Sequence, residues 1–215
     1  MRAITLSPGV PNSANLEHIP EPPESHGSIL VRSLALGVSK APTGCDWTKA
    51  ALTVLDDVWV LGEIQAKQDI LAELGYTLPL EIGPDAYTPA REAYANHLVR
   101  TALEGGIGDI ASALLPCAMF TEVIGGRFKG LTIGGPPAYQ KWANIYVERA
   151  VHRMAAAHSQ MMETEAARTD ERGRARMRLL YRRSVQHQID VFDAAWYDTN
   201  TWAGSPEPVR AGTGA

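Results

Sequence analysis

The cysteine at position 117 directly follows a proline, inside an apolar stretch of helical spacing, ALLPCAMFTEVIGGRF. A thiolate is a strong nucleophile, so such a cysteine can carry covalent chemistry when a base or hydrogen-bond network favours its ionised form. No residue adjacent in the sequence supplies that help, and a cysteine on an apolar helix most often packs as a small buried hydrophobe. From the residues alone, a nucleophile and a core residue are both open interpretations of Cys117.

Two histidines lie at helical spacing from a carboxylate, His152 four residues after Glu148 and His187 three residues before Asp190. Such pairs can bind a metal in a helical bundle, but these two do not complete a carboxylate–histidine site. Exposed polar faces and ion pairs are the commoner use of such spacing. The sequence has no H-E-x-x-H, Walker loop or G-x-G-x-x-G motif, and we therefore expect no metal and no cofactor.

The composition excludes several classes of protein. Of the 215 residues 45% are hydrophobic and 20% are charged, with a net charge of −4, which does not favour nucleic acid or an anionic membrane as partner. The basic run RGRARMRLLYRR is flanked by Glu165 and Glu171, so we interpret it as a solvated helix face. No apolar run approaches the roughly 18 residues of a membrane span. With no signal-peptide core and only two distant cysteines, we expect a cytoplasmic protein.

The sequence pattern changes near residue 45. Before it, short strand-like runs (RAITL, ANLEHI and GSILVRSLAL) are separated by proline-rich turns. After it the apolar period is helical, and we expect helices near 48–75, 88–104, 107–128, 137–165 and 170–198. The sequence thus predicts an all-α bundle with a short β-rich N-terminal segment that makes few contacts with the bundle, and a disordered tail at 203–215.

Four motifs follow one another in the second half of the chain. They are EAYANHL, then ALLPC with EVIGG, then Tyr139-x-x-Trp142-x-x-x-Tyr146, and finally RSVQHQIDVFDAAWYD. Their order and spacing resemble those of the TenA / thiaminase II family of aminopyrimidine hydrolases, over roughly residues 50–202. The resemblance implies an all-α, heme-oxygenase-like bundle, usually a homotetramer, that needs no metal.

The resemblance also implies roles for individual residues. Cys117 occupies the position of the nucleophile that adds to the electron-poor ring of a small-molecule pyrimidine, so that the amine can leave from the 5-methylene carbon. Tyr94 and Tyr146 match tyrosines that line the pocket, and Thr121 stands where the family has another tyrosine. Gln188 replaces a family glutamate, and an amide cannot exchange a proton as a carboxylic acid does. The early helix that carries a pyrimidine-binding aspartate has no counterpart, so an impaired hydrolase is expected.

Two other functions are compatible with the same bundle. One is a non-catalytic helical oligomer or a protein that binds an aromatic heterocycle. The other is a metal-dependent oxygenase, which requires at least three converging histidine or carboxylate groups. A cavity lined by Tyr94 and Tyr146, with a carboxylate facing Cys117, would favour the hydrolase.

The N-terminal segment has a resemblance of its own. Residues 1–38 resemble the first strands of the GroES-like domain of medium-chain alcohol and glucose dehydrogenases. TGCD, at 43–46, only faintly resembles that family's zinc-binding motif, and no nucleotide-binding domain follows. We therefore interpret the chain as a fusion of a dehydrogenase-like fragment (1–45) with a TenA-like domain (46–202), without dehydrogenase activity.

Overall fold

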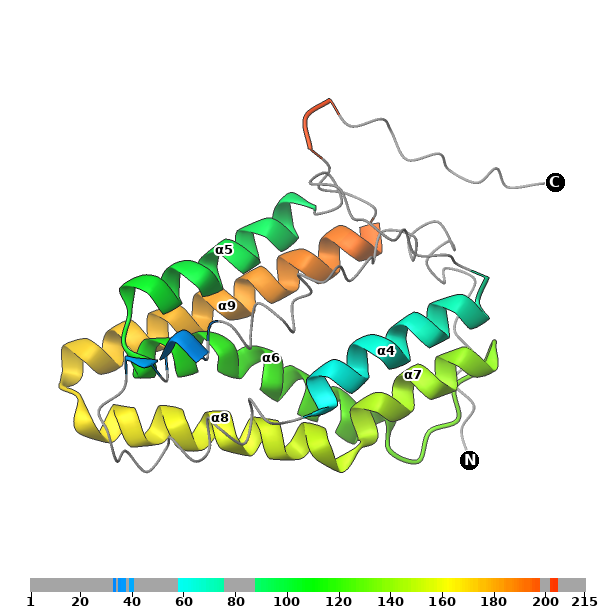
Figure 1. Cartoon of the computed structure of the whole chain (residues 1–215), viewed down its shortest axis with the longest axis horizontal. Helices are drawn as coiled ribbons and strands as arrows, with labels where there is room; N and C mark the ends of the chain where they lie inside the picture. The colour runs from blue at the N-terminus through cyan, green and yellow to red at the C-terminus, as the bar shows by residue number, and fades with distance from the viewer. Residues whose placement is uncertain are drawn as a thin grey trace.

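A computed structural model of the chain describes residues 33, 35–37, 39–40, 58–75, 88–197 and 202–204. Six long helices account for most of these residues (Figure 1). They are α4 (Val58–Glu73), α5 (Pro89–Glu104), α6 (Ile107–Phe128), α7 (Pro137–Val147), α8 (Arg149–Arg168) and α9 (Glu171–Tyr197). Helices α5 and α9 lie side by side, and α4 packs on α7.

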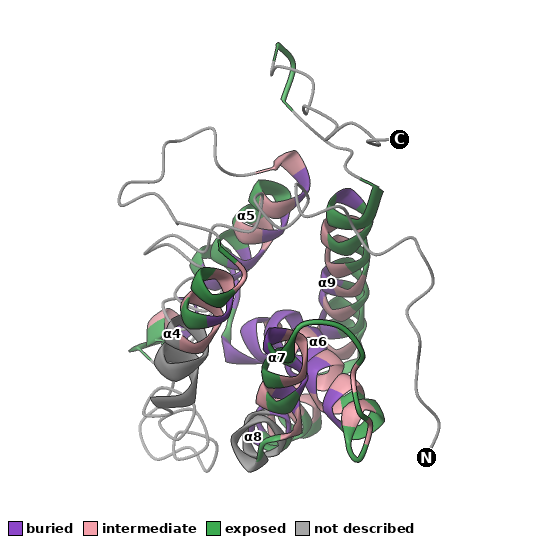
Figure 2. Ribbon diagram, turned by 90° about the vertical axis from the view of Figure 1, so that its right-hand side faces the viewer, coloured by how far each residue is buried: buried purple, intermediate pink, exposed green. Residues whose placement is uncertain are grey.

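Helix α6 is the centre of the bundle, because it contacts α5, α7, α8 and α9. Buried residues are concentrated along it, as Figure 2 shows. Leu98 of α5, Ile110 and Leu114 of α6, and Met161 of α8 are each almost fully buried in one core cluster. Burial of a side chain of this size stabilises the fold by about 1.5–3 kcal/mol. The helix continues through Pro116 without a break, so this core surrounds Cys117 on both sides along the helix.

The length and composition of α6 would also allow it to cross a membrane. Its mean hydropathy reaches 1.5, and it is the one helix among the described residues that meets this criterion. The expectation that no stretch of the chain approaches a membrane span is therefore wrong for α6. However, 61% of the apolar window is buried inside the bundle. The central helix of a helical core has the same composition because it is covered on most sides.

Most of the predicted helices agree with the structure, and α5, α6 and α9 do so within one or two residues. The helix predicted over 137–165 is wrong as a single element, because Glu148 is extended (φ −68°, ψ 148°) and separates α7 from α8. No glycine or proline marks this break. The end of α7 lies directly against α6, where a Cβ on Gly125 would be 1.8 Å from the carbonyl oxygen of Tyr146. A packing contact, rather than a local sequence signal, accompanies the end of α7.

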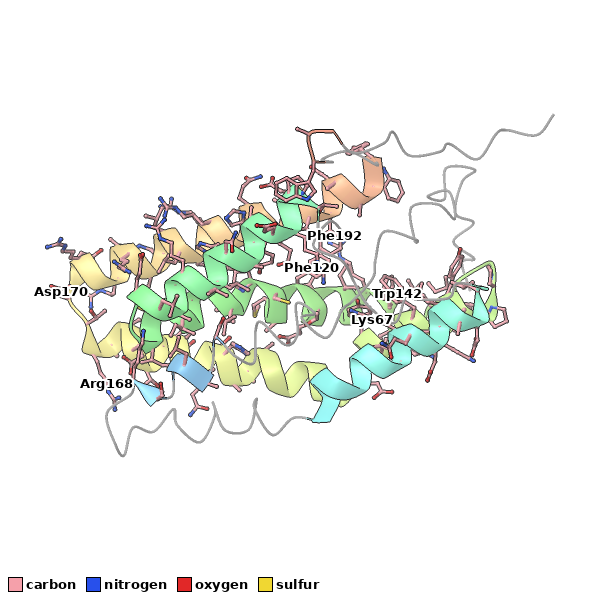
Figure 3. All side chains as sticks on the ribbon, turned by 45° about the horizontal axis from the view of Figure 1, so that its top comes forward. Lys67, Phe120, Trp142, Arg168, Asp170 and Phe192 are labelled. Atoms are coloured by element: carbon pink, nitrogen blue, oxygen red, sulfur yellow. The ribbon has the colours of Figure 1, made fainter. Side chains whose placement is uncertain are left out.

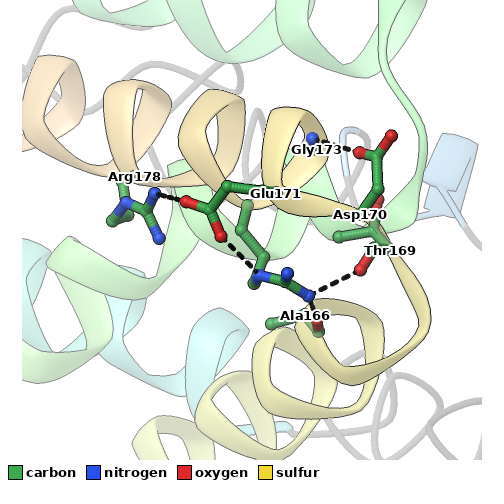
Figure 4. Close-up of polar contacts among 7 residues, drawn as sticks. Ala166, Thr169, Asp170, Glu171, Gly173 and Arg178 are labelled. Atoms are coloured by element: carbon green, nitrogen blue, oxygen red, sulfur yellow. Dashed lines mark hydrogen bonds and ion pairs between the residues drawn. The ribbon is translucent and has the colours of Figure 1, made fainter.

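The turn between α8 and α9 is held by polar contacts (Figure 4). Asp170 caps α9, since its Oδ1 accepts a hydrogen bond of 2.8 Å from the backbone N–H of Gly173. Arg174 donates to the carbonyl of Thr169 at 2.7 Å and pairs with Glu171 at 3.0 Å. Glu171 also pairs with Arg178 at 2.5 Å. Arg178 is exposed, in agreement with the interpretation of this basic run as a solvated helix face, whereas Arg174 is half-buried against the turn.

The described residues near the N-terminus contact the bundle. Residues 33, 35–37 and 39 are helical, so the strand predicted for GSILVRSLAL (27–36) is wrong at 33, 35 and 36. Gly37 lies against Ile107 and Ile110 at the start of α6, and Ser33 is buried. Lys40 Nζ donates hydrogen bonds to the carbonyls at the end of α5, those of Ala102 (2.5 Å) and Leu103 (2.7 Å).

These contacts contradict the expected strand structure and isolation of the N-terminal segment at the described positions. Packing on α6 outweighs the β propensity of this short apolar run, as tertiary context commonly does. The expectation of few contacts with the bundle is wrong for 33–40. The other residues of the predicted β-rich segment 1–45, and most of the tail predicted at 203–215, lie outside the described residues.

Candidate active site

The sequence and the packing of α5 place Tyr94 in the core. The helix begins with Pro89 at its first position, and Thr88 Oγ1 accepts a hydrogen bond of 3.3 Å from the N–H of Arg91. Tyr94 follows one turn later and is only 4% exposed. Cys117, partly buried on α6, packs against the same core cluster.

Tyr94 and Cys117 interact electrostatically. Burial raises the pKa of the Tyr94 phenol well above its usual value of about 10, and negative charge on Cys117 raises it further. The phenol therefore stays protonated at any pH at which the protein would work. A protonated phenol beside a thiol can donate a hydrogen bond to the thiolate, which is the form of cysteine that reacts.

Two histidines adjoin Tyr94 on the side of α9. The ring of His187 stacks on the phenol, with centroids 5.8 Å apart and planes 16° apart. The ring of His97, one turn along α5 from Tyr94, lies 5.0 Å from that of His187. His97 Nε2 and the buried hydroxyl of Ser184 share a hydrogen bond of 3.0 Å. The two helices thus hold a connected aromatic and polar cluster next to the cysteine site.

The environment of both histidines favours the uncharged ring. Burial, reinforced by His187, lowers the pKa of His97 to about 4. Burial also lowers the pKa of His187, although the carboxylate of Asp190 partly opposes this effect. Two imidazoles this close cannot both be charged without strong repulsion. Near neutral pH, therefore, both rings are neutral and can pack against Tyr94.

Tyr146 belongs to a second aromatic group, at the far end of α6. Its ring lies 5.0 Å from that of Trp142 and 6.5 Å from that of Phe128, both in edge-on geometry. Tyr146 itself is 8% exposed. Tyr94, Cys117 and Tyr146 thus come from three different helices, as expected, whereas their convergence on one cavity stays a prediction.

Thr121 and Gln188 lie near the site by their positions on the helices. Thr121 is buried one turn after Cys117, and its hydroxyl donates a hydrogen bond of 2.7 Å to the carbonyl of Ala118. Gln188 is half-buried, one turn after the fully buried Ser184 and three residues before Val191, which packs against the core. This spacing puts Gln188 on the inward face of α9. Its role stays a prediction.

Two cavities lie at opposite ends of α9. The first, of about 370 Å³, is lined by His187, Asp190 and Asp193 together with the first turn of α5. The second, of about 210 Å³, lies at the start of α6 beside Glu165 and the ion pair of Asp109 with Arg176. Neither of these cavities is lined by Cys117, Tyr94 or Tyr146.

Among the described residues, no group of three or more histidine, cysteine or carboxylate side chains could hold a metal ion. The side chain of His152, paired with Glu148 in the sequence analysis, lies outside the described residues.

The sequence analysis missed the site neighbours His97 and Ser184, and it considered His187 only as a partner of Asp190. The spacing of these residues along their helices could have indicated them as neighbours. Tyr94 and His97 are three residues apart, as are Ser184 and His187, so each pair shares a helix face. That the two faces oppose one another follows only from the packing of α5 on α9.

Comparison with known proteins gives this arrangement a context. The sequence profile of the TENA/THI-4/PQQC family matches residues 29–198. The chain belongs to this family. The match begins at residue 29, inside the segment 1–45 that the sequence analysis assigned to a separate N-terminal unit.

The TENA/THI-4/PQQC relatives include two curated aminopyrimidine aminohydrolases. The protein of Halalkalibacterium halodurans is 24% identical over 111 residues, and that of Bacillus subtilis is 25% identical over 118 residues. These matches cover 51% and 55% of this chain and 49% of each relative, so the chain spans about half the length of these enzymes. A shorter match, 36% identical over 75 residues, is to a glucose 1-dehydrogenase of Thermoproteus tenax and covers 29% of this chain and 22% of that enzyme.

Solved structures of TenA proteins share the fold. A TenA homologue from P. horikoshii OT3 superposes with a TM-score of 0.69 at 19% identity, covering 89% of this chain and 86% of the other. A TenA-like thiaminase from Sulfolobus solfataricus, itself described as putative, gives 0.63 at 17% identity, covering 88% and 81%. The predicted TenA-like helical bundle is confirmed.

Proposed function

We propose that the chain is a thiaminase II-like aminopyrimidine hydrolase with Cys117 as its nucleophile. The observation that carries the proposal is the coincidence of the family match with the local chemistry. The family profile spans residues 29–198, and Cys117 packs against the core cluster that contains Tyr94, whose phenol stays protonated. The aminopyrimidine aminohydrolases of two bacteria support the same substrate class.

In the proposed reaction the Cys117 thiolate adds to an electron-poor carbon of the pyrimidine ring. The addition disrupts the aromatic system, and the amine then takes up a proton and leaves from the 5-methylene carbon. Water adds to that carbon, and loss of the Cys117 thiolate restores the aromatic ring. Tyr94 donates a hydrogen bond to the thiolate or ring, and Tyr146 and Thr121 line the site. Gln188 can bind the ring by hydrogen bonds but cannot exchange protons with it. Acid–base assistance is commonly worth about 10²–10⁴-fold, so slow turnover is expected.

We also propose that the protein works in the cytoplasm as a homotetramer. Exposed apolar side chains on α9 support self-association: Ile189, Phe192 and Trp196 are 47%, 49% and 57% exposed. Phe192 pairs with Phe120 of α6, with ring centroids 4.8 Å apart (Figure 3). A neighbouring subunit that covered this face would remove apolar surface from water.

A second candidate is a non-catalytic protein of the same fold that binds an aromatic heterocycle. The amide at Gln188 favours it, because binding needs a hydrogen-bonding group there whereas proton transfer needs an acid. The two cavities described above, neither of which is lined by Cys117, are also compatible with this candidate.

The test combines binding and turnover of 4-amino-5-aminomethyl-2-methylpyrimidine. Calorimetric titration of the purified protein establishes whether the ring binds, and ammonia release measures hydrolysis. We expect binding by both wild type and Cys117→Ala, and turnover by wild type alone. Cys45→Ala is the matched control and should keep its turnover. Binding without turnover in the wild type would favour the second candidate, and absence of binding would contradict both.

A further inference from the structure

His187 occupies a position between solvent and the cysteine site. On one side it lines the 370 Å³ cavity with Asp190 and Asp193. On the other its ring stacks on Tyr94, and Cys117 packs against the core cluster to which Tyr94 belongs. Tyr94 thus connects His187, at the cavity, with the core cluster against which Cys117 packs.

Two further residues, His97 and Ser184, support the stacking of His187 on Tyr94. His97 lies 5.0 Å from His187 and is itself hydrogen-bonded to Ser184, which is fully buried. His97 comes from the same helix as Tyr94, and Ser184 from the same helix as His187. The imidazole of His187 therefore contacts two rings of α5, those of Tyr94 and His97.

We propose that uncharged His187 is the positioning residue of the Cys117 site: its ring holds the phenol of Tyr94 against the thiol, and protonation of the imidazole releases that hold. The inference rests on the proposed function only in giving Cys117 a catalytic task. The placement of the phenol can be measured without any turnover.

The charged groups around His187 determine in which direction its imidazole moves when it is protonated. From α5 it faces His97 and the phenol of Tyr94, and from α9 it is near Arg183 and Asp190. From α6, Cys117 packs against the same core cluster as Tyr94. Arg183 repels an imidazolium at this position, and the loss of water beside His97 disfavours its charge. Asp190, which lines the cavity, attracts it. Protonation therefore draws the ring away from Tyr94 and toward the carboxylates, as acid pH is approached.

Two substitutions distinguish the effect of the aromatic ring of His187 from the effect of its protonation. His187→Phe keeps an aromatic ring against Tyr94 but cannot titrate, and His187→Ala removes both properties. Gln160→Ala, at an exposed position of α8, is the matched control. All variants are made in a Cys45→Ser background, so that Cys117 is the single thiol.

The first readout is NMR of ¹³C-labelled tyrosine rings, with the Tyr94 signal assigned from Tyr94→Phe. In the parent protein this signal should move with a single acidic titration that coincides with that of the His187 imidazole. In His187→Phe the signal should keep its ring-current shift and lose the pH dependence. In His187→Ala the ring-current shift should disappear.

The second readout is the rate at which iodoacetamide alkylates Cys117 at pH 7. Loss of the phenol as a donor to the thiolate raises the thiol pKa, so His187→Ala should react about 3- to 10-fold more slowly. His187→Phe and Gln160→Ala should react within about twofold of the parent protein.

Failure of the inference is distinct from failure of the proposed function. A Tyr94 signal that is unchanged by pH and by both substitutions would overturn the positioning role, even if the protein hydrolyses aminopyrimidine. The expected NMR and alkylation pattern in a protein without turnover would establish the positioning role and overturn the hydrolase alone. If His187→Ala does not fold, the His187→Phe titration still decides, because retention of the acidic inflection there contradicts the inference.

Discussion

A methyl group at Gly125 should disrupt the contact between α6 and α7. The Cβ of an alanine there would lie 1.8 Å from the carbonyl oxygen and 2.7 Å from the carbonyl carbon of Tyr146. Both atoms belong to the backbone of α7, so no side chain can rotate away. The end of α7 must move by at least about 1 Å, and overpacking of this kind typically costs about 1–3 kcal/mol.

The adjacent Gly126 is a matched control for this substitution. It is exposed on the same helix, and a Cβ there meets no atom within 4 Å. Replacing glycine by alanine in a helix interior stabilises it by about 0.5–1 kcal/mol. We therefore expect Gly126→Ala to raise the free energy of unfolding by that amount. Gly125→Ala should lower it by about 1–2 kcal/mol, since the same gain in propensity offsets part of the clash.

Urea unfolding of both variants, followed by far-UV circular dichroism, measures the difference. In a thermal scan the Gly125→Ala midpoint should fall by roughly 2–8 °C, given about 2–4 °C per kcal/mol for a chain of this size. Equal stabilisation by the two substitutions would show that α6 and α7 are not in backbone contact. In that case the proposed place of Tyr146 near the site would also lose its support.

The other predictions concern the site and the N-terminal contact. If aminopyrimidine binds, Gln188→Glu should raise kcat by about 10- to 100-fold and change KM little, because a carboxylic acid assists the transition state; equal kcat values for both proteins would contradict the assigned role. Because the pKa of His97 is lowered to about 4 in the folded state, the unfolded chain binds the extra proton first, and stability should fall as pH decreases from about 6.5 to 4. The loss is about 1–2 kcal/mol after allowance for partial solvent screening, and urea unfolding across this pH range should show it in wild type and much less in His97→Gln. Lys40→Met, which keeps most of the aliphatic stem but removes the bonds to the end of α5, should cost about 1 kcal/mol in the same assay, whereas Lys129→Met at an exposed position should cost nothing measurable. Deleting residues 1–40 should cost more than about 2 kcal/mol, since it also removes packing against α6.

The helices were largely predictable because the sequence marks their ends. The pair Gly105–Gly106 separates α5 from α6, and Asp170 supplies the cap of α9. The break at Glu148 was not predictable, because it coincides with a close approach of α7 to Gly125, a residue more than twenty positions earlier. Local propensity contains no information about such a contact.

The candidate site was predictable only in part. Motif order identified Cys117 and Tyr94, and in the structure Cys117 packs against the core cluster that contains Tyr94. The neighbours His97 and His187 were not identified, because their meeting depends on the angle and register between α5 and α9. A pair of residues far apart in the sequence gives no local signal of contact.

The exposed aromatic side chains of α9 affect how the stability of this protein must be measured. Dyes that fluoresce on apolar surfaces report unfolding only if the folded protein offers them little to bind. Here Phe192 and Trp196 already present about half of their surfaces to solvent in the fold. Where this face is left uncovered, a dye-based melting experiment should start from a high signal and show a shallow or inverted transition. Intrinsic signals from the helical backbone avoid this artefact, and the initial dye signal itself becomes a measure of how much of this face another molecule covers.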